Sequence, residues 1–181
     1  LGDLHAKMRA CRQCLEAGFS VTPGAVFSGP ASARLMFVGQ APGVTECDTG
    51  RPFNGSSGER LFDWLAEAGW DEPAFRAAHY LTAVTKCYPG KSPNGKGDRA
   101  PTRAEQKLCA PYLKQELALV QPRVIVPVGS LAVRRFLGEV RLTDVVGTVV
   151  EESEGHSIVP LPHHSGVNLW LNRPENQERV A

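Results

Sequence analysis

The sequence of 181 residues predicts an α/β fold, in which a parallel sheet carries helices on both faces. Short apolar runs typical of buried strands alternate with segments whose apolar residues recur at helical spacing, and this alternation implies parallel strands joined by helices. The expected strands are, in chain order, 34–38, 79–84, 124–128 and 157–161. No internal repeat and no linker divides the sequence, so we expect a single domain over residues 1–181.

The first helix is predicted from apolar residues that share one face, namely Leu4, Met8, Cys11 and Leu15. Gly18 is expected to end it, since glycine is the usual residue just beyond a helix C-terminus. Residues 20–33 then read as a loop rich in Gly and Pro.

The longest later helix is predicted from its capping box. Thr102 and Glu105 have the spacing at which each side chain bonds the other residue's backbone N–H, so a helix should run from there to about Val120. The remaining helices are expected over 57–68, from 71, over 130–137 and around 170–172, with a turn or hairpin within 141–155.

The loop that follows the first strand, residues 39–55, is the most unusual stretch of the sequence. It is rich in Gly and Pro, and it exceeds the roughly two to six residues usual for such connections. It also contains Glu46, Asp48 and Phe53. Because α/β proteins place their sites at the carboxyl ends of strands, we interpret this loop as part of a site; the alternative is an ordinary connection.

Three kinds of side chain near the strand ends have the chemistry of a reactive site. Glu46 and Asp48 are candidate general bases or water-orienting groups, although both are also consistent with solvated loop charges. Phe53 offers a flat apolar face, or else belongs to the core. His163, after the last strand, is a donor that could meet developing negative charge, or a structural histidine.

The charge pattern limits the choice of partners. A net charge of +1 produces no overall field for a polyanion, so only a local basic patch could bind one. Such a patch exists in the loop 88–102, which could hold phosphates without reading a base sequence, unless its charges are merely solvated. Its basic residues are Lys91, Lys96, Arg99 and, at its end, Arg103.

The five cysteines argue against a closed disulfide framework, because their number is odd. Cys11 and Cys14 lie one turn apart in the predicted first helix, and Cys87 and Cys109 complete a set of four. Four thiolates hold zinc or an iron–sulfur cluster, and the ligand type alone does not separate the two. The alternative is two unrelated buried thiols and a redox Cys-x-x-Cys pair. Cys47 is then the cysteine left over.

Five short motifs follow one another in a characteristic order. They are Gly39–Gly43, Gly50–Gly55, Thr82–Cys87, Cys109 and His163-His164-Ser165. This order resembles that of the uracil-DNA glycosylase superfamily, and most closely its iron–sulfur group, often called family four. The resemblance covers nearly the whole chain, from about Cys11 to Asn172.

The resemblance implies a three-layer α/β/α sandwich with a four-stranded parallel sheet. It also implies a [4Fe–4S] cluster, rather than zinc, as the cofactor. The cluster ligands would be Cys11, Cys14, Cys87 and Cys109. No apolar run is long enough to span a bilayer and no signal-peptide pattern opens the sequence, so we expect a cytoplasmic protein without a membrane partner. The resemblance implies a monomer of bacterial or archaeal type.

The function implied by the resemblance is base excision repair of DNA. These enzymes extrude a uracil nucleotide from DNA and hydrolyse the bond between base and sugar. Phe53 would stack on the base, His163 would stabilise the charge on the leaving base, and Gln40 and Ala41 would line the pocket through their backbone. The segment expected to enter the duplex consists of Ser165, Gly166, Val167, Asn168 and Leu169.

Four positions depart from the family pattern. Gln40 stands where family four usually has Glu; because an amide cannot act as a general base, Glu46 or Asp48 is a candidate to replace it. Ala83 stands where an Asn usually pairs with the uracil edge, and Asn54, where Val is common, is a candidate reader from another direction. The fourth departure is His164, where the family usually has Pro.

These departures keep two other functions open. One is a glycosylase-like iron–sulfur protein, weak or inactive in catalysis, that binds single-stranded or damaged DNA. The other is a redox-sensing iron–sulfur protein that reuses the fold. A dinucleotide-binding enzyme is disfavoured, because the first loop lacks the Gly-x-Gly-x-x-Gly spacing.

Overall fold

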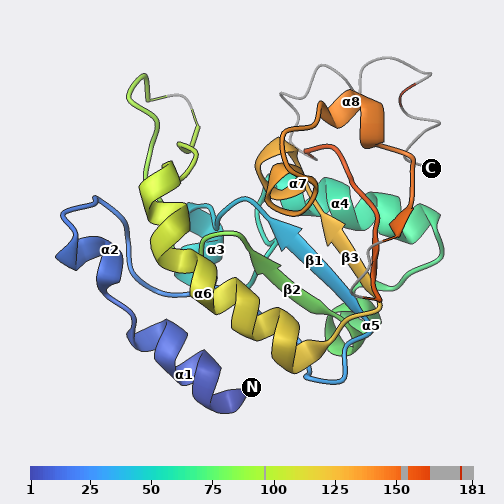
Figure 1. The fold of residues 1–181 in the computed structure, drawn as a ribbon, viewed down its shortest axis with the longest axis horizontal. Coiled ribbons are helices and arrows are strands. Elements are labelled where there is room, and N and C mark those ends of the chain that lie inside the picture. Colours follow the sequence, from blue (N-terminus) through green and yellow to red (C-terminus); the bar gives the residue numbers. More distant parts are fainter. Residues whose placement is uncertain (96, 152–154, 164–175, 177–181) are drawn as a thin grey trace.

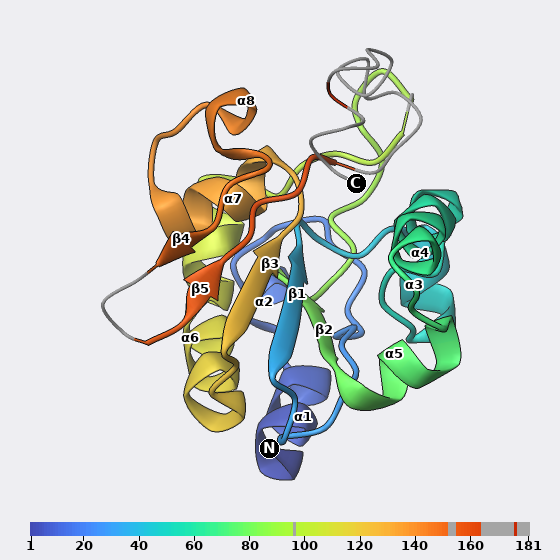
Figure 2. The ribbon, with the colours of Figure 1, turned by 90° about the vertical axis from the view of Figure 1, so that its right-hand side faces the viewer.

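The structure is a computed structural model and describes residues 1–95, 97–151, 155–163 and 176. Within these residues it has three layers, with a sheet between two groups of helices (Figures 1 and 2). Helices α6 and α7 cover one face, and α4 and α5 cover the other. The helices are α1 (Gly2–Ala10), α2 (Gln13–Glu16), α3 (Val44–Thr49), α4 (Ser56–Glu67), α5 (Glu72–Ala78), α6 (Arg103–Val120), α7 (Ser130–Leu137) and α8 (Leu142–Val145). None of the helices described here is long and apolar enough to cross a bilayer.

The sheet has five strands in the described part of the chain, in the order β2-β1-β3-β5-β4. The strands are β1 (Leu35–Gly39), β2 (Tyr80–Ala83), β3 (Val124–Pro127), β4 (Val150–Glu151) and β5 (Ser157–Ile158). The expected four parallel strands are present as β2, β1, β3 and β5. The expected strand number is wrong by one, because β4 pairs antiparallel with β5 at the edge. A two-residue strand is too short to show an alternating pattern in the sequence.

The prediction of one continuous first helix is also wrong. Two helices replace it, because Cys11 has extended backbone (φ −62°, ψ 134°) and ends α1. Leu4 and Met8 are buried against Phe27, whereas Leu15 is 41% exposed and is not part of this cluster. The turn at Cys11 directs the chain so that Cys11 and Cys14 line one cavity.

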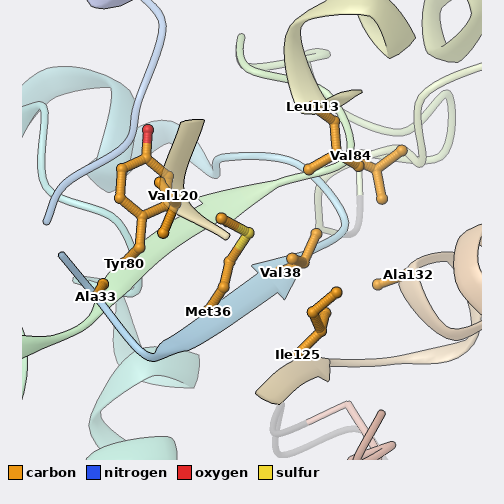
Figure 3. Close-up of a cluster of buried hydrophobic side chains, with 9 residues drawn as sticks. All are labelled: Ala33, Met36, Val38, Tyr80, Val84, Leu113, Val120, Ile125 and Ala132. Carbon is orange, nitrogen blue, oxygen red and sulfur yellow. The ribbon is translucent and has the colours of Figure 1, made fainter. Parts of the chain in front are cut away.

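The strands divide their side chains between two cores. In β1, Met36 and Val38 point to the α6 and α7 side, where they meet side chains such as Leu113 and Ala132 (Figure 3). Phe37 points to the opposite face and packs with Phe75 of α5. This alternation follows from the two-residue period of a strand, and it buries both faces of the sheet.

A buried ion pair joins the segment just after β2 to α6. Nζ of Lys86 lies 2.6 Å from Oε2 of Glu116, and the two side chains are 2% and 0% exposed. Oε1 of Glu116 accepts hydrogen bonds from the hydroxyls of Tyr80 and Thr82, each at 3.0 Å. The Lys86 ammonium also donates to the hydroxyl of Thr82 at 2.8 Å and to the carbonyl of Ala83. Because a buried charge is tolerated only when paired, each partner depends on the other.

We expect Glu116→Gln to lower the free energy of unfolding by about 3–5 kcal/mol, because it leaves the Lys86 ammonium buried without its counter-charge. Urea unfolding measures this loss. The matched control is Asp144→Asn, which makes the same change in an exposed ion pair with Arg141 and should alter the free energy far less. Equal effects of the two variants would contradict the importance of the buried pair.

Candidate functional site

A cleft of about 710 Å³ opens at the carboxyl ends of β1, β2 and β3. Most of the side chains singled out in the sequence line it, although they come from five separate stretches of the chain. The predicted residues in its wall are Gln40, Ala41, Glu46, Phe53, Ala83, Arg99 and His163. Asp48 and Asn54 do not line it. The duplex-entering segment predicted over 165–169, and His164, lie outside the described residues.

The Phe53 side chain lies over the end of β1. Its ring would be 3.2 Å from a β-carbon at Gly39, which is closer than an ordinary contact, so glycine lets the ring lie this close to the strand. Phe37 meets it edge to face from the core side, with 6.5 Å between ring centroids. Phe53 is only 8% exposed but still forms part of the cleft wall, so the predicted flat apolar face is available there.

The backbone of Phe53 has a positive φ of 52°, which is uncommon outside glycine. Arg76 of α5 holds this conformation, because its guanidinium donates to the carbonyls of Pro52 at 2.7 Å and Phe53 at 2.8 Å. The same guanidinium bonds Glu72 at 2.7 Å. A β-carbon at Gly58 would lie 2.2 Å from the Phe53 carbonyl oxygen, so the first turn of α4 requires glycine at this position. The sequence contains no signal for the role of Arg76, which depends on contacts across 23 residues.

Glu46 is held by backbone amides. Its Oε2 accepts from the N–H of Gly43 at 3.0 Å, and its Oε1 accepts from those of Asn54 at 3.3 Å and Gly55 at 3.2 Å. The carboxylate therefore fixes both ends of the loop around α3, a short helix within the stretch that the sequence predicts to be a loop. Asp48 lies exposed on α3.

The side chains of Gln40 and Ala83 lie at the ends of neighbouring strands. The backbone there continues the pairing of β1 with β2, since the N–H of Val84 donates to the Gly39 carbonyl at 2.9 Å and that of Thr85 to the Gln40 carbonyl at 3.3 Å. Ala83 is 6% exposed and contributes only a methyl group to the cleft. The amide of Asn54 donates to the hydroxyl of Thr49 at 3.3 Å, outside the cleft.

His163 reaches the cleft from the strand that continues β5. Leu161 pairs in parallel with Val128, and the N–H of Gly129 donates to the Leu161 carbonyl at 2.9 Å. A β-carbon at Gly129 would be 3.1 Å from Cδ2 of His163, so the imidazole packs directly on the backbone that follows β3. Burial lowers the pKa of His163 below its usual 6.5, because the charged form is poorly solvated there.

The basic loop 88–102 has its described charges paired within the chain. Lys91 and Asp98 form an ion pair at 2.9 Å. Arg99 makes two bonds to Glu105, at 2.8 and 2.6 Å, which lower the pKa of that carboxyl to about 2. Asp98 and Arg99 also line the cleft. The sequence carries no signal for Asp98, since a single acid in a basic loop has no distinguishing pattern.

The four predicted ligand cysteines line a second, small cavity between α1, α2 and α6. Burial raises the pKa of Cys109 to about 11 and also raises the pKa values of Cys14 and Cys87, so these thiols stay protonated without a bound cation. Near them, the Lys86 N–H donates to Sγ of Cys109 at 3.3 Å. No three His, Cys, Asp or Glu side chains among the residues described converge as ligands of one metal ion would.

Comparison with known proteins finds similarity over most of the chain. The family model described as "Uracil DNA glycosylase superfamily" matches residues 26–181. A "Type-4 uracil-DNA glycosylase" of Thermotoga maritima is 32% identical over 177 residues, which are 97% of this chain and 85% of that protein. A protein of the same name from Archaeoglobus fulgidus is 35% identical over 157 residues, 86% of this chain and 71% of that protein.

A further relative, a "Type-5 uracil-DNA glycosylase" of Pyrobaculum aerophilum, is 33% identical over 159 residues. It matches 80% of this chain and 67% of its own length. The family match extends from before β1 to the last residue of the chain, and so includes every residue found in the wall of the cleft. The chain belongs to the uracil DNA glycosylase superfamily.

Proposed function

We propose that this protein is a DNA glycosylase of base excision repair, which hydrolyses the N-glycosidic bond of a uracil or another deaminated or damaged base flipped out of DNA. The observation that carries the proposal is the single cleft that joins Phe53, His163 and the end of β1. A flipped base needs a flat apolar surface to stack on and a polar group at its edge, and this cleft offers both.

The imidazole of His163 supplies the polar group for the leaving base. When the bond between sugar and base breaks, its electron pair leaves with the base, and negative charge spreads to the base carbonyl oxygens. A neutral imidazole carries one N–H that donates to such an oxygen, and its fixed packing on Gly129 means that little reorientation is needed. Burial favours this neutral form, since it lowers the pKa of His163.

The wall formed by β2 sets the base preference. With a methyl group at Ala83, the cleft has no side-chain amide at this point to pair with the edge of uracil. A site that lacks a polar reader discriminates poorly between bases of similar shape. We therefore propose uracil as the main substrate, with other deaminated bases accepted more readily than in a site that carries the amide.

We also propose that Cys11, Cys14, Cys87 and Cys109 hold a [4Fe–4S] cluster. All four line one cavity, and thiolates are the usual ligands of such clusters. The cluster would act by stabilising the fold around α1, α2 and the loop after β2, because hydrolysis requires no electron transfer.

Alkaline strand cleavage of end-labelled oligonucleotides tests the glycosylase activity. Each oligonucleotide carries one uracil, hypoxanthine, xanthine or alkylated base, in single- and double-stranded form. We expect an abasic product with uracil, and a loss of about 10²–10³-fold in rate for His163→Ala, the effect of removing one donor to a developing oxyanion. Tight, salt-dependent binding without product from any base would instead support a non-catalytic DNA-binding protein.

The protonation state of His163 is a separate prediction. Because burial lowers its pKa, the side chain should be neutral above pH 6.5 and take up a proton only below it. The imidazole resonances of His163, identified by their absence in His163→Gln, should therefore titrate in NMR spectra with a midpoint below 6.5. A midpoint above that value would show that the imidazole is stabilised as a cation.

The cluster ligands are tested by comparing two cysteine variants. Protein purified without oxygen should contain iron and acid-labile sulfide and absorb visible light. Cys14→Ser should lose most of all three, whereas Cys47→Ser should keep them, because Cys47 does not line the cavity. Equal iron and sulfide contents in both variants would reject the proposed ligand set.

A further inference from the structure

Two carboxylates reach the cleft from the described residues, and they approach the same point of its wall. A β-carbon at Gly43 would be 2.7 Å from Oε2 of Glu46 and 3.1 Å from Oδ2 of Asp98. Glycine leaves this point free of any side chain. The two acids come from different segments, the helix α3 and the loop 88–102, so their meeting is a product of the tertiary structure.

Glu46 is poorly suited to react with a substrate. Its two oxygens accept hydrogen bonds from three backbone N–H groups, at 3.0, 3.3 and 3.2 Å. Those bonds use its lone pairs and hold the loop in place, and moving the carboxylate toward a substrate would leave the amides without acceptors.

Asp98 is arranged differently. Its Oδ1 accepts from the hydroxyl of Tyr88 at 2.8 Å and from Nζ of Lys91 at 2.9 Å. Within the described residues, every side-chain bond to Asp98 goes to Oδ1, which leaves Oδ2 on the side of Gly43 and the cleft. The side chain is 32% exposed, so water has access to it. The carboxylate is thus held by one oxygen and available through the other.

We propose that Asp98 is the catalytic carboxylate of the cleft, which holds the attacking water and places a negative charge near the sugar of the flipped nucleotide. This inference rests on the proposed glycosylase function. In the reaction the bond between C1′ and the base breaks with its electron pair on the base, and the water oxygen forms the new bond to C1′. The proton that the water loses passes to Oδ2 of Asp98. Gln40, in the same wall, orients the water through its amide, which cannot take the proton.

The variant Asp98→Asn tests this role with little change in structure. An Asn side chain keeps an Oδ1 that accepts from Tyr88 and Lys91, and it replaces only the oxygen that faces Gly43. Single-turnover release of the base, with enzyme in excess, should fall about 10²–10⁴-fold, as expected for loss of a general base. Affinity for DNA that carries an uncleavable 2′-fluoro form of the nucleotide should stay equal or increase, because removal of a negative charge favours binding to phosphates.

The matched control is Tyr88→Phe, which removes one bond to Oδ1 and leaves Oδ2 unchanged. If Asp98 acts through Oδ2, this control should release the base at close to the wild-type rate. If Asp98 serves only to hold the loop 88–102, Tyr88→Phe should be the slower of the two variants, and its DNA affinity should fall as well.

The outcomes separate the two proposals. An active wild type with an equally active Asp98→Asn variant would overturn the role of Asp98 and leave the glycosylase function standing. A wild type that releases no base from any oligonucleotide would overturn the glycosylase function, and the role of Asp98 with it. A slow Asp98→Asn variant that binds DNA normally, beside a fast Tyr88→Phe variant, is the result that supports both.

Discussion

The parallel pairing of β1 with β2 on one side and β3 on the other is the constraint on which the rest of the structure depends. Met36 lies beside Tyr80 in one neighbour and Ile125 in the other, and these three side chains form the centre of one core (Figure 3). A slip of one residue would exchange the two faces of β1, because side chains alternate along a strand. It would also move Gly39 from beneath Phe53, so the same pairing that builds the core sets the floor of the cleft.

Two side chains of opposite charge hold the backbone of the loop after β1 by hydrogen bonds. Arg76 binds the carbonyls of Pro52 and Phe53, and Glu46 binds three amides of the same loop. Between them they stabilise the left-handed conformation of Phe53, which an isolated chain would rarely adopt. Glu46, which the sequence suggests as a candidate general base, therefore stabilises the backbone conformation of the site.

The cleft and the cysteine cavity share a wall made by the end of β2 and the residues after it. Lys86 connects the two cavities. Its backbone N–H donates to Sγ of Cys109 in the cysteine cavity, and its ammonium donates to Thr82 and Ala83, which line the cleft. Pro89 lines both cavities. Because Lys86 is fully buried and paired with Glu116, this wall is anchored in the core. A group bound by the cysteines and a nucleotide in the cleft would therefore rest on the same rigid stretch of chain.

The sequence by itself determined the features that depend on local patterns. Identifiable features were the four parallel strands, the capping box of Thr102 and Glu105, and the motif residues Phe53 and His163. Periodicity, caps and motifs depend on residues that are close together in the sequence. Only the tertiary structure decided that α1 ends at Cys11 and that β4 is added at the edge of the sheet. It also decided the hydrogen bond from Arg76 to the Phe53 carbonyl and the position of Asp98 next to Gly43. Most of these join segments far apart in the chain or, like β4, are too short to show a period. No local pattern records such contacts, since they arise when packing brings the segments together.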